Sequence, residues 1–219
     1  MMTMTEKTAA ILRILNKKFP DAGIQLKYKD NFQLLSSVIL SAQCTDARVN
    51  IVTPLLFSKY KNIKEFADAD IKELENIIKS TGFFRQKAKR IKESARMILD
   101  EFKGKVPNKM TDLLRLPGVA RKTANVVLQN AYGINEGIVV DTHVRRVSNR
   151  LGLTGSKDPV RIEQDLMHQF NSKDYRKVSD LLIFHGRYTC KAQRPLCHEC
   201  GLYDYCTFKD KKKFSEPKK

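Results

Sequence analysis

Apolar residues recur at a spacing of three or four along most of the chain, which is the period of an amphipathic α-helix. The pattern gives no pair of alternating runs joined by a hairpin turn, and the short apolar run Ile138–Val140 fits a strand or a buried connection equally well. We therefore expect an all-α protein. The helices predicted in this way cover residues 5–19, 31–42, 46–54, 71–81, 84–103, 111–116, 121–132, 159–170 and 175–185, and a further helix after Asp141 carries Val144 and Val147.

Prolines, glycines and small polar residues set the expected ends of these helices. Pro54 is expected to end or kink its helix, and Gly186 to close the helix that carries His185. Asp158 followed by Pro159 is typical of an N-cap with proline at the first helical position. The lysine-rich segment 209–219 is expected to be an unstructured basic tail.

The stretch Leu116–Lys122 predicts a tight turn between two helices. Pro117 and Gly118 interrupt the helical pattern, and it resumes with Lys122 in the first helical turn. Free backbone N–H groups and the positive end of the helix dipole lie at such a start, so a phosphate can bind there and the neutral amine of a lysine is favoured over its ammonium. A neutral lysine is a nucleophile able to form a Schiff base. The alternative is an ordinary solvated lysine.

Net charge narrows the choice of partner. The 219 residues contain 41 Lys and Arg against 24 Asp and Glu, a formal net charge of +17. This excess favours a polyanion, with nucleic acid first and an anionic membrane surface second. No basic segment leads an apolar run at the start, and no stretch is long enough to span a membrane. We therefore expect a soluble, intracellular protein without a membrane partner.

Two aromatic residues precede a strongly basic segment. Phe83 and Phe84 are followed by a run of cations that could hold a nucleic-acid backbone while an aromatic ring enters the base stack. The alternative is that both rings belong to the core. The cations are Arg85, Lys87, Lys89 and Arg90.

Four of the five cysteines lie together near the end of the chain. Cys190, Cys197, Cys200 and Cys206 have six, two and five residues between them. In an intracellular protein such a set is better explained as ligands of an inorganic centre than as disulfides. Zinc is the alternative to iron–sulfur, although zinc sites usually use two Cys-x-x-Cys pairs or histidine. Cys44 is separate from this set and is expected to be a small buried hydrophobe.

Taken in order, these motifs resemble the endonuclease III family of DNA glycosylases with AP lyase activity. The resemblance rests on four segments and the cysteine spacing, and covers nearly the whole chain: Ser41–Asp46, Leu116–Val127, Val140–His143 and His185–Cys190. It implies a 4Fe–4S cluster on the four cysteines. It also implies two helical domains flanking a DNA-binding groove: a six-helix barrel with the helix–hairpin–helix over 25–137, and a discontinuous iron–sulfur cluster domain over 1–24 and 138–219.

The resemblance also assigns roles to single residues. It makes Lys122 the nucleophile and Asp141 its catalytic partner, although aspartate before a helix is also an ordinary N-cap. It places Gln43 and Phe83 where the duplex is filled and wedged after a base is flipped out. Ala120 stands where the family motif usually has glycine, and Phe83 where leucine is common. The further expected DNA contacts are Gly118, Ala120, Arg121, His143, Lys191 and Arg194.

The expected function is therefore base excision repair. The protein is expected to act as a monomer in the cytoplasm, at the nucleoid, on double-stranded DNA with a damaged pyrimidine or an abasic site. A related adenine-removing glycosylase would carry Glu in place of Ser37, would lack Lys122 and would usually have a further C-terminal domain. The remaining alternative is a non-enzymatic iron–sulfur DNA-binding protein with a helix–hairpin–helix.

Overall fold

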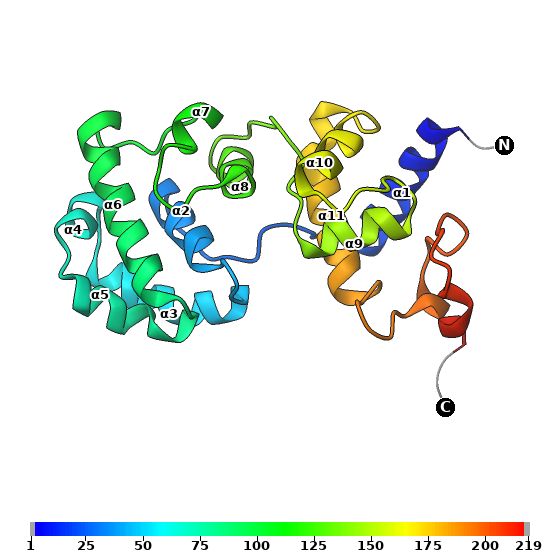
Figure 1. Ribbon diagram of the computed structural model, residues 1–219, viewed down its shortest axis with the longest axis horizontal. Helices are drawn as coiled ribbons and strands as arrows, with labels where there is room; N and C mark the ends of the chain where they lie inside the picture. Colours follow the sequence, from blue (N-terminus) through cyan, green and yellow to red (C-terminus); the bar gives the residue numbers. More distant parts are fainter. Residues whose placement is uncertain (1–2, 217–219) are drawn as a thin grey trace. The chain divides into compact units, whose positions relative to one another are not determined.

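A computed structural model describes residues 3–216, in which all regular secondary structure is helical and no β-strand occurs (Figure 1). Backbone contacts divide the chain into two compact units. We call Gln25–Ile134 the hairpin unit, and the described residues 3–24 and 135–216 the cysteine unit. Within the described part of the chain, no helix is both long and apolar enough to cross a membrane.

The hairpin unit packs its helices around α6. This helix lies against α2, α4 and α5, while α2 also packs against α8. The core consists of aliphatic side chains with an aromatic group of Phe32, Tyr60 and Phe66. The elements are α2 Asn31–Leu40, α3 Asp46–Lys59, α4 Ile63–Asp68, α5 Ile71–Ile78, η1 Lys79–Thr81, α6 Phe84–Phe102, α7 Met110–Leu113 and α8 Arg121–Ala131.

The cysteine unit joins α1 to the last third of the chain. Helix α11 packs against α1 and α9, and α10 packs against α9. The shared core includes Ile11, Val147 and Leu182. The elements are α1 Met4–Lys18, α9 Thr142–Arg150, α10 Pro159–Met167, η2 Ser172–Asp174, α11 Tyr175–Tyr188, η3 Cys197–Glu199 and η4 Lys211–Phe214.

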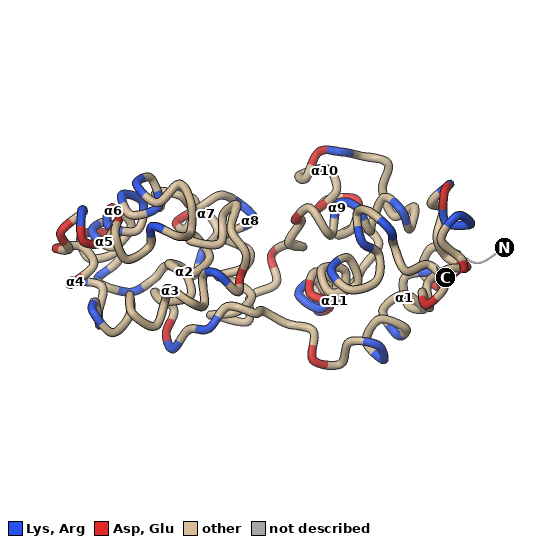
Figure 2. The backbone as a smooth tube through the Cα atoms, turned by 90° about the horizontal axis from the view of Figure 1, so that it is seen from below, with Lys and Arg blue, Asp and Glu red and all other residues tan. Residues whose placement is uncertain are grey.

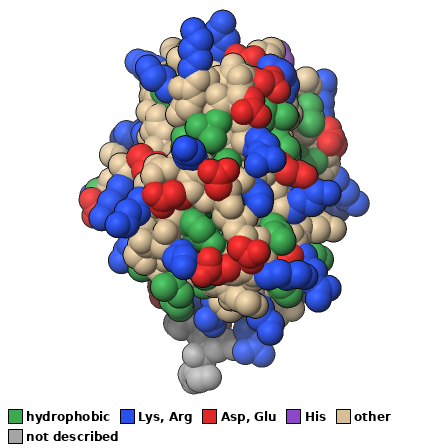
Figure 3. All heavy atoms as spheres, turned by 90° about the vertical axis from the view of Figure 1, so that its left-hand side faces the viewer, with side chains coloured by type: hydrophobic (Ala, Val, Ile, Leu, Met, Phe, Trp, Pro, Cys, Tyr) green, Lys and Arg blue, Asp and Glu red, His purple; other side chains and the backbone are tan. Residues whose placement is uncertain are grey.

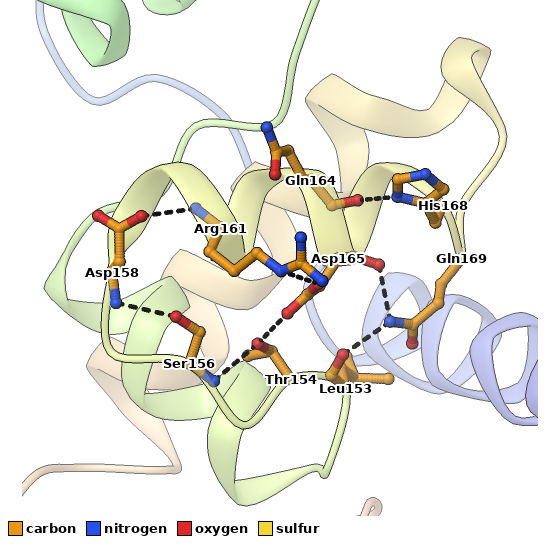
Figure 4. A network of polar contacts seen from close by, with 9 residues as sticks. All are labelled: Leu153, Thr154, Ser156, Asp158, Arg161, Gln164, Asp165, His168 and Gln169. Carbon is orange, nitrogen blue, oxygen red and sulfur yellow. Dashed lines mark hydrogen bonds and ion pairs between the residues drawn. The ribbon is translucent and has the colours of Figure 1, made fainter.

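Side-chain caps start most of these helices. The side chains of Asp30, Thr45 and Asp70 cap α2, α3 and α5. Asp158 caps α10, with Pro159 at its first position as predicted. Figure 4 shows how this cap joins a network in which Thr154 donates to Asp165 (2.5 Å) and Gln169 donates to the carbonyl of Leu153 (2.7 Å). The loop before α10 is thereby fixed to the helix.

Several expected helix ends are wrong. The helix containing Pro54 continues to Lys59, and the six-residue α4 was missed because it is too short to show a period. Gly186 does not close α11, which runs to Tyr188. A Cβ on Gly186 would lie 2.8 Å from the Cβ of His143. The glycine therefore allows α11 to approach α9 closely, and does not end a helix.

The structure also shows the conformation of two segments outside the long helices. Ile138 and Val139 form a buried connection, not a strand, and the N–H of Val139 donates to Ser179 Oγ. The lysine-rich segment was expected to be unstructured, yet η4 forms within it. Lys211 explains this difference, because its Nζ donates to the carbonyls of Tyr203 and Cys206 (2.9 and 2.7 Å). Residues 217–219 of the expected tail lie outside the described residues.

Positive charge is unevenly distributed over the hairpin unit. Figure 3 shows a face on which basic and acidic side chains are interleaved, and α4 and α5 carry more acidic than basic residues. The first two thirds of α6 hold six cations against one acidic residue, Glu93. Figure 2 marks Lys and Arg along both units. A polyanion is therefore attracted more strongly to the start of α6 than to α4 and α5.

Asp180 on α11 provides a pH-dependent prediction. Burial raises the pKa of Asp180 to about 6, against the opposing effect of Arg176. Unfolding returns the carboxyl to its ordinary pKa, so the unfolded state binds fewer protons between about pH 4 and 6 and stability falls as the pH rises through this window. We expect Asp180→Asn to raise the free energy of unfolding at pH 7.5 by about 1–3 kcal/mol. Urea unfolding should show this gain shrinking as the pH falls toward 4, and a pH-independent gain would contradict the argument.

Candidate active site and cysteine centre

The predicted hairpin forms between α7 and α8. The N–H of Val119 donates to the carbonyl of Leu116 (3.1 Å), and Gly118 has φ +83°, a conformation that favours glycine. Ala120 is the N-cap of α8, and no side chain caps this helix start. Lys122 is the second residue of α8 and is exposed. The hairpin thus places an accessible amine beside N–H groups that lack a side-chain acceptor.

Alanine at position 120 is compatible with this turn. Ala120 has φ −93° and ψ 171°, an extended conformation that any residue adopts. The family's usual glycine is therefore not needed here to reach a left-handed conformation. Gly118 differs, because a Cβ there would lie 2.7 Å from Cδ of Arg90. Arg90 and Ser94 of α6 support the hairpin, and Ser94 Oγ donates to the carbonyl of Pro117 (2.9 Å).

Gln43 and Phe83 share an unusual backbone conformation. Both are exposed and left-handed, with φ of 53° and 47°, and Phe83 is 63% exposed. Phe84 is half-buried beneath the guanidinium of Arg85. Phe83 is therefore not a core residue. The expectation that Lys87 belongs to a backbone-binding run is wrong, since its side chain is buried and only 2% exposed.

Asp141 acts as a helix cap in the cysteine unit. Its Oδ1 accepts hydrogen bonds from the N–H groups of His143 and Val144, both at 2.8 Å. The cap uses one carboxylate oxygen and fixes the orientation of the other. His143 lies beside Arg146, with 3.2 Å between its Nδ1 and Arg146 Nη2. Burial lowers the pKa of His143, although Asp141 opposes this shift.

The four clustered cysteines line one cavity, while Cys44 lies in the other unit. His185, Arg150 and Lys211 also line this cavity, and Cys44 belongs to Gln25–Ile134. Burial raises the pKa of Cys200 to about 11 and also raises that of Cys197. The sulfur of Cys200 lies 3.8 Å from Nε2 of His185. Binding of an inorganic centre must therefore supply enough positive charge to hold buried sulfurs as thiolates.

A single zinc ion and a multi-iron cluster need different arrangements of four cysteine sulfurs. Four thiolates on a zinc ion, with Zn–S of about 2.3 Å, would lie only about 3.8 Å apart. Within residues 3–216, no three Cys, His, Asp or Glu side chains converge as a single ion requires. A multi-iron cluster bound by four thiolates needs a wider arrangement of the same donors. The donor set of Cys190, Cys197, Cys200 and Cys206 therefore fits an iron–sulfur cluster.

Two arginines of α9, which sequence reasoning missed, organise the cysteine loop. Arg150 donates from Nη1 to Cys190 Sγ (3.3 Å) and to the carbonyl of Lys191 (2.8 Å). Arg146 donates from Nε to the carbonyl of Cys190 (3.0 Å). Lys191 and Arg194 are exposed in the loop that follows Cys190, and Arg194 is left-handed with φ 50°. The loop presents these two cations while the arginines of α9 hold its backbone.

The structure thus distributes the expected site residues between the two units. The hairpin unit contains Gln43, Phe83, Gly118, Ala120, Arg121 and Lys122. Asp141, His143, Lys191, Arg194 and the four cysteines lie in the cysteine unit. Each unit therefore contributes its own set of candidate DNA contacts.

Loss of one clustered cysteine tests the centre. We expect Cys200→Ala to lose most of its bound iron and its visible absorption, because three thiolates cannot complete a four-thiolate cluster. Iron and sulfide per chain, with the absorption spectrum, provide the measurement. Cys44→Ala is the matched control, since Cys44 lies in the other unit, and it should keep full iron content. Full iron in Cys200→Ala would contradict this ligand set.

Comparison with known proteins shows to which class of protein this chain belongs. The model of the HhH-GPD superfamily of base excision DNA repair proteins matches residues 36–172. The iron–sulfur binding domain of endonuclease III matches residues 190–206, the span of the four cysteines. Fold and site thus define a helix–hairpin–helix protein of base excision DNA repair that binds an iron–sulfur cluster.

Relatives and solved structures refine this class. The chain is 52% identical to endonuclease III of Synechocystis sp. over 94% of both chains, and 47% identical to that of Bacillus subtilis over 86% of both. It is similar to a non-covalent endonuclease III–DNA complex (42% identity, TM-score 0.90, 97% and 98% of the two chains). A trapped endonuclease III–DNA covalent intermediate gives 41% identity and a TM-score of 0.91 over 99% and 100% of the chains.

The chain belongs to the endonuclease III family. It is a DNA glycosylase with AP lyase activity in base excision repair, and it carries a 4Fe–4S cluster. The all-α fold, the DNA partner and the cofactor expected from sequence are confirmed. Neither the adenine-removing nor the non-enzymatic alternative is favoured.

Proposed function

We propose that the protein removes damaged pyrimidines from double-stranded DNA, with Lys122 as the nucleophile. The observation that carries this proposal is the exposed amine of Lys122 at an uncapped helix start, directly after the Gly118 turn. Damaged pyrimidines that have lost aromatic stacking leave the duplex at lower cost, and this lower cost provides part of the selectivity.

The proposed reaction has two stages. The neutral amine of Lys122 attacks the sugar C1′ as the glycosidic bond breaks, and the departing base carries away the bonding electrons and takes a proton. The C1′–O4′ bond of the sugar ring then breaks, the ring oxygen keeps the bonding electrons and takes a proton, and the nitrogen gives up its second proton as the C=N bond of the Schiff base forms. The imine acidifies C2′, so removal of its proton breaks the C3′–O bond, and the 3′-side phosphate leaves. This β-elimination cuts the strand.

Asp141 is the proposed catalytic partner of this lysine. Its capped carboxylate would accept a proton from the attacking amine or stabilise the cation that develops on the sugar. The support is its fixed orientation at the start of α9, together with the family resemblance of the Val140–His143 segment. Because one oxygen is used in the cap, the other is the candidate for this role.

We further propose how the DNA is held. Gln43 and Phe83 would fill and wedge the duplex, which is supported by their exposure and left-handed backbone. The proposed contacts to the DNA backbone are Gly118, Ala120, Arg121, His143, Lys191 and Arg194. The bound cluster would be ligated by Cys190, Cys197, Cys200 and Cys206, and would supply a rigid anchor for the loop that presents Lys191 and Arg194.

We also propose how the chain is divided into domains and where the protein acts. Residues 25–137 would form one domain, and 1–24 with 138–219 the other, which is supported by the two compact units. We also propose that the protein works as a monomer in the cytoplasm at the nucleoid, in keeping with its formal net charge of +17.

Borohydride trapping tests the nucleophile. With an abasic-site duplex, reduction of the Schiff base should join protein and DNA covalently, and mass spectrometry of the digested adduct should map the added mass to Lys122. An undamaged duplex of the same sequence is the control and should give no adduct. If the wild-type protein gave no adduct, or gave one on another lysine, this proposal would fail.

A further inference from the structure

Lys87 is a buried cation whose surroundings differ from those of the other cations of α6. Its Nζ donates to two backbone carbonyls, those of Leu40 and Thr81, both at 2.8 Å. In the part of the chain that the structure describes, no carboxylate forms an ion pair with it. Burial lowers the pKa of Lys87, which shows the cost of keeping this ammonium away from water.

The two carbonyls belong to the ends of two separate helices. Leu40 is the last residue of α2, and Thr81 is the last residue of η1. Carbonyl groups at helix ends lack intrahelical donors and carry the negative end of the helix dipole, so an ammonium is a suitable partner. Lys87 therefore links two helix ends that lie far apart in sequence.

Each linked end is followed closely by a left-handed residue, Gln43 after α2 and Phe83 after η1. Gln43 follows Leu40 by three positions, and Phe83 follows Thr81 by two. The backbone N–H of Lys87 also donates to the carbonyl of Phe83 (3.1 Å). Left-handed non-glycine residues are strained and persist only where their surroundings hold them. The side chain of Lys87 thus contacts the backbone just before both exposed residues, Gln43 and Phe83.

We propose that Lys87 is a positioning residue for base extrusion, which holds the Gln43 and Phe83 segments in one fixed arrangement so that both side chains enter the duplex together. The inference rests on the proposed wedge role of these two residues. Lys87 does not touch DNA in this role, because its ammonium is enclosed between α2, η1 and α6. Its effect is transmitted through the backbone.

The role predicts a difference between substrates. Excision of a 5,6-dihydropyrimidine from a fully paired duplex requires extrusion, whereas β-elimination at an abasic site in single-stranded DNA does not. We expect Lys87→Met to slow single-turnover excision from the duplex by about tenfold to hundredfold, because small misplacements of positioning groups have effects of this size. The lyase rate on single-stranded DNA should change less than about threefold.

Lys92→Met is the matched control. Lys92 lies on the same helix and donates from Nζ to the carbonyl of Ala69 (2.6 Å), so the variant loses the same charge and one hydrogen bond of the same kind. Ala69 lies between α4 and α5, and not next to Gln43 or Phe83. Both rates should stay within about threefold of wild type in this variant, as expected for a residue outside the positioning contacts.

A double-mutant cycle separates positioning from general destabilisation. In a Gln43→Ala, Phe83→Ala background there is nothing left to position, so adding Lys87→Met should change duplex excision less than about twofold. Hydrogen exchange of the wild-type and Lys87→Met proteins gives a second readout: amides 41–45 and 81–83 should lose protection together. If Lys87→Met does not fold at the assay temperature, Lys87→Gln takes its place in the same cycle.

Three results would overturn the inference. These are equal slowing on both substrates, the same slowing in the Gln43→Ala, Phe83→Ala background, or full duplex excision by that background protein. Borohydride trapping of wild-type protein on an abasic duplex is run alongside. An adduct there, with no substrate difference in Lys87→Met, rejects positioning by Lys87 and leaves the Lys122 proposal intact.

Discussion

Replacing Lys122 with glutamine should slow strand cleavage at an abasic site by at least about 10³-fold, because an amide cannot form the Schiff base. Glutamine keeps most of the side-chain length and is as favourable in a helix as lysine, so α8 should be unchanged. Only one surface charge is lost, and the affinity for DNA should fall only a few-fold. Single-turnover cleavage of an abasic duplex and the Kd for a non-cleavable analogue at fixed salt measure the two effects.

Lys109→Gln is the control for this prediction. Lys109 is exposed in the same unit, directly before α7, and its side chain makes no capping hydrogen bond. Its replacement removes the same charge and should leave cleavage within about threefold. Cleavage at the wild-type rate by Lys122→Gln would show that Lys122 has no role in the mechanism and is an ordinary solvated lysine.

Helical period and capping chemistry predicted most of the helices, since these signals are local. Asp158 with Pro159 marks the start of α10 because both residues act within the first helical turn. The six residues of α4 fall below the length at which a period can be recognised. Pro54 does not end α3, so the loss of one hydrogen bond and the ring clash are accommodated within this helix.

Residue type alone misled where distant segments meet. Glycine often marks the end of a helix, yet Gly186 lies within α11 and allows this helix to approach His143 closely. A lysine in a basic run is expected to contact phosphate, yet Lys87 is buried against two helix ends. Both functions depend on what another element places against the residue, and no local pattern carries that information.

The candidate site also contains residues that a local pattern predicted and residues that only the packed structure identifies. Cysteine spacing predicted one site for four thiols, because the reach of the chain limits where ligands at most 16 positions apart can lie. Arg150 and Arg146 could not be selected among the 41 cations, since their partners are carbonyls of a loop some 40 residues later. Only the packed structure identifies them.

Asp141→Asn should separate the two functions of its carboxyl group. Asparagine is as good an N-cap as aspartate, so the free energy of unfolding should change by less than about 0.5 kcal/mol. The negative charge is lost, and strand cleavage should slow by about 10²-fold if the carboxylate accepts a proton or stabilises the sugar cation. Asp141→Ala should show the same kinetic loss and also destabilise the protein by about 1 kcal/mol.

Asp158→Asn completes this comparison. Asp158 caps α10 in the same unit by accepting the N–H of Arg161 (3.0 Å), so the substitution changes charge and cap in the same way. It should leave both cleavage and stability near wild type, because the mechanism assigns no role to this cap. If Asp141→Asn cleaved abasic DNA as fast as Asp158→Asn, Asp141 would be a cap alone, and proton transfer from Lys122 would need another acceptor.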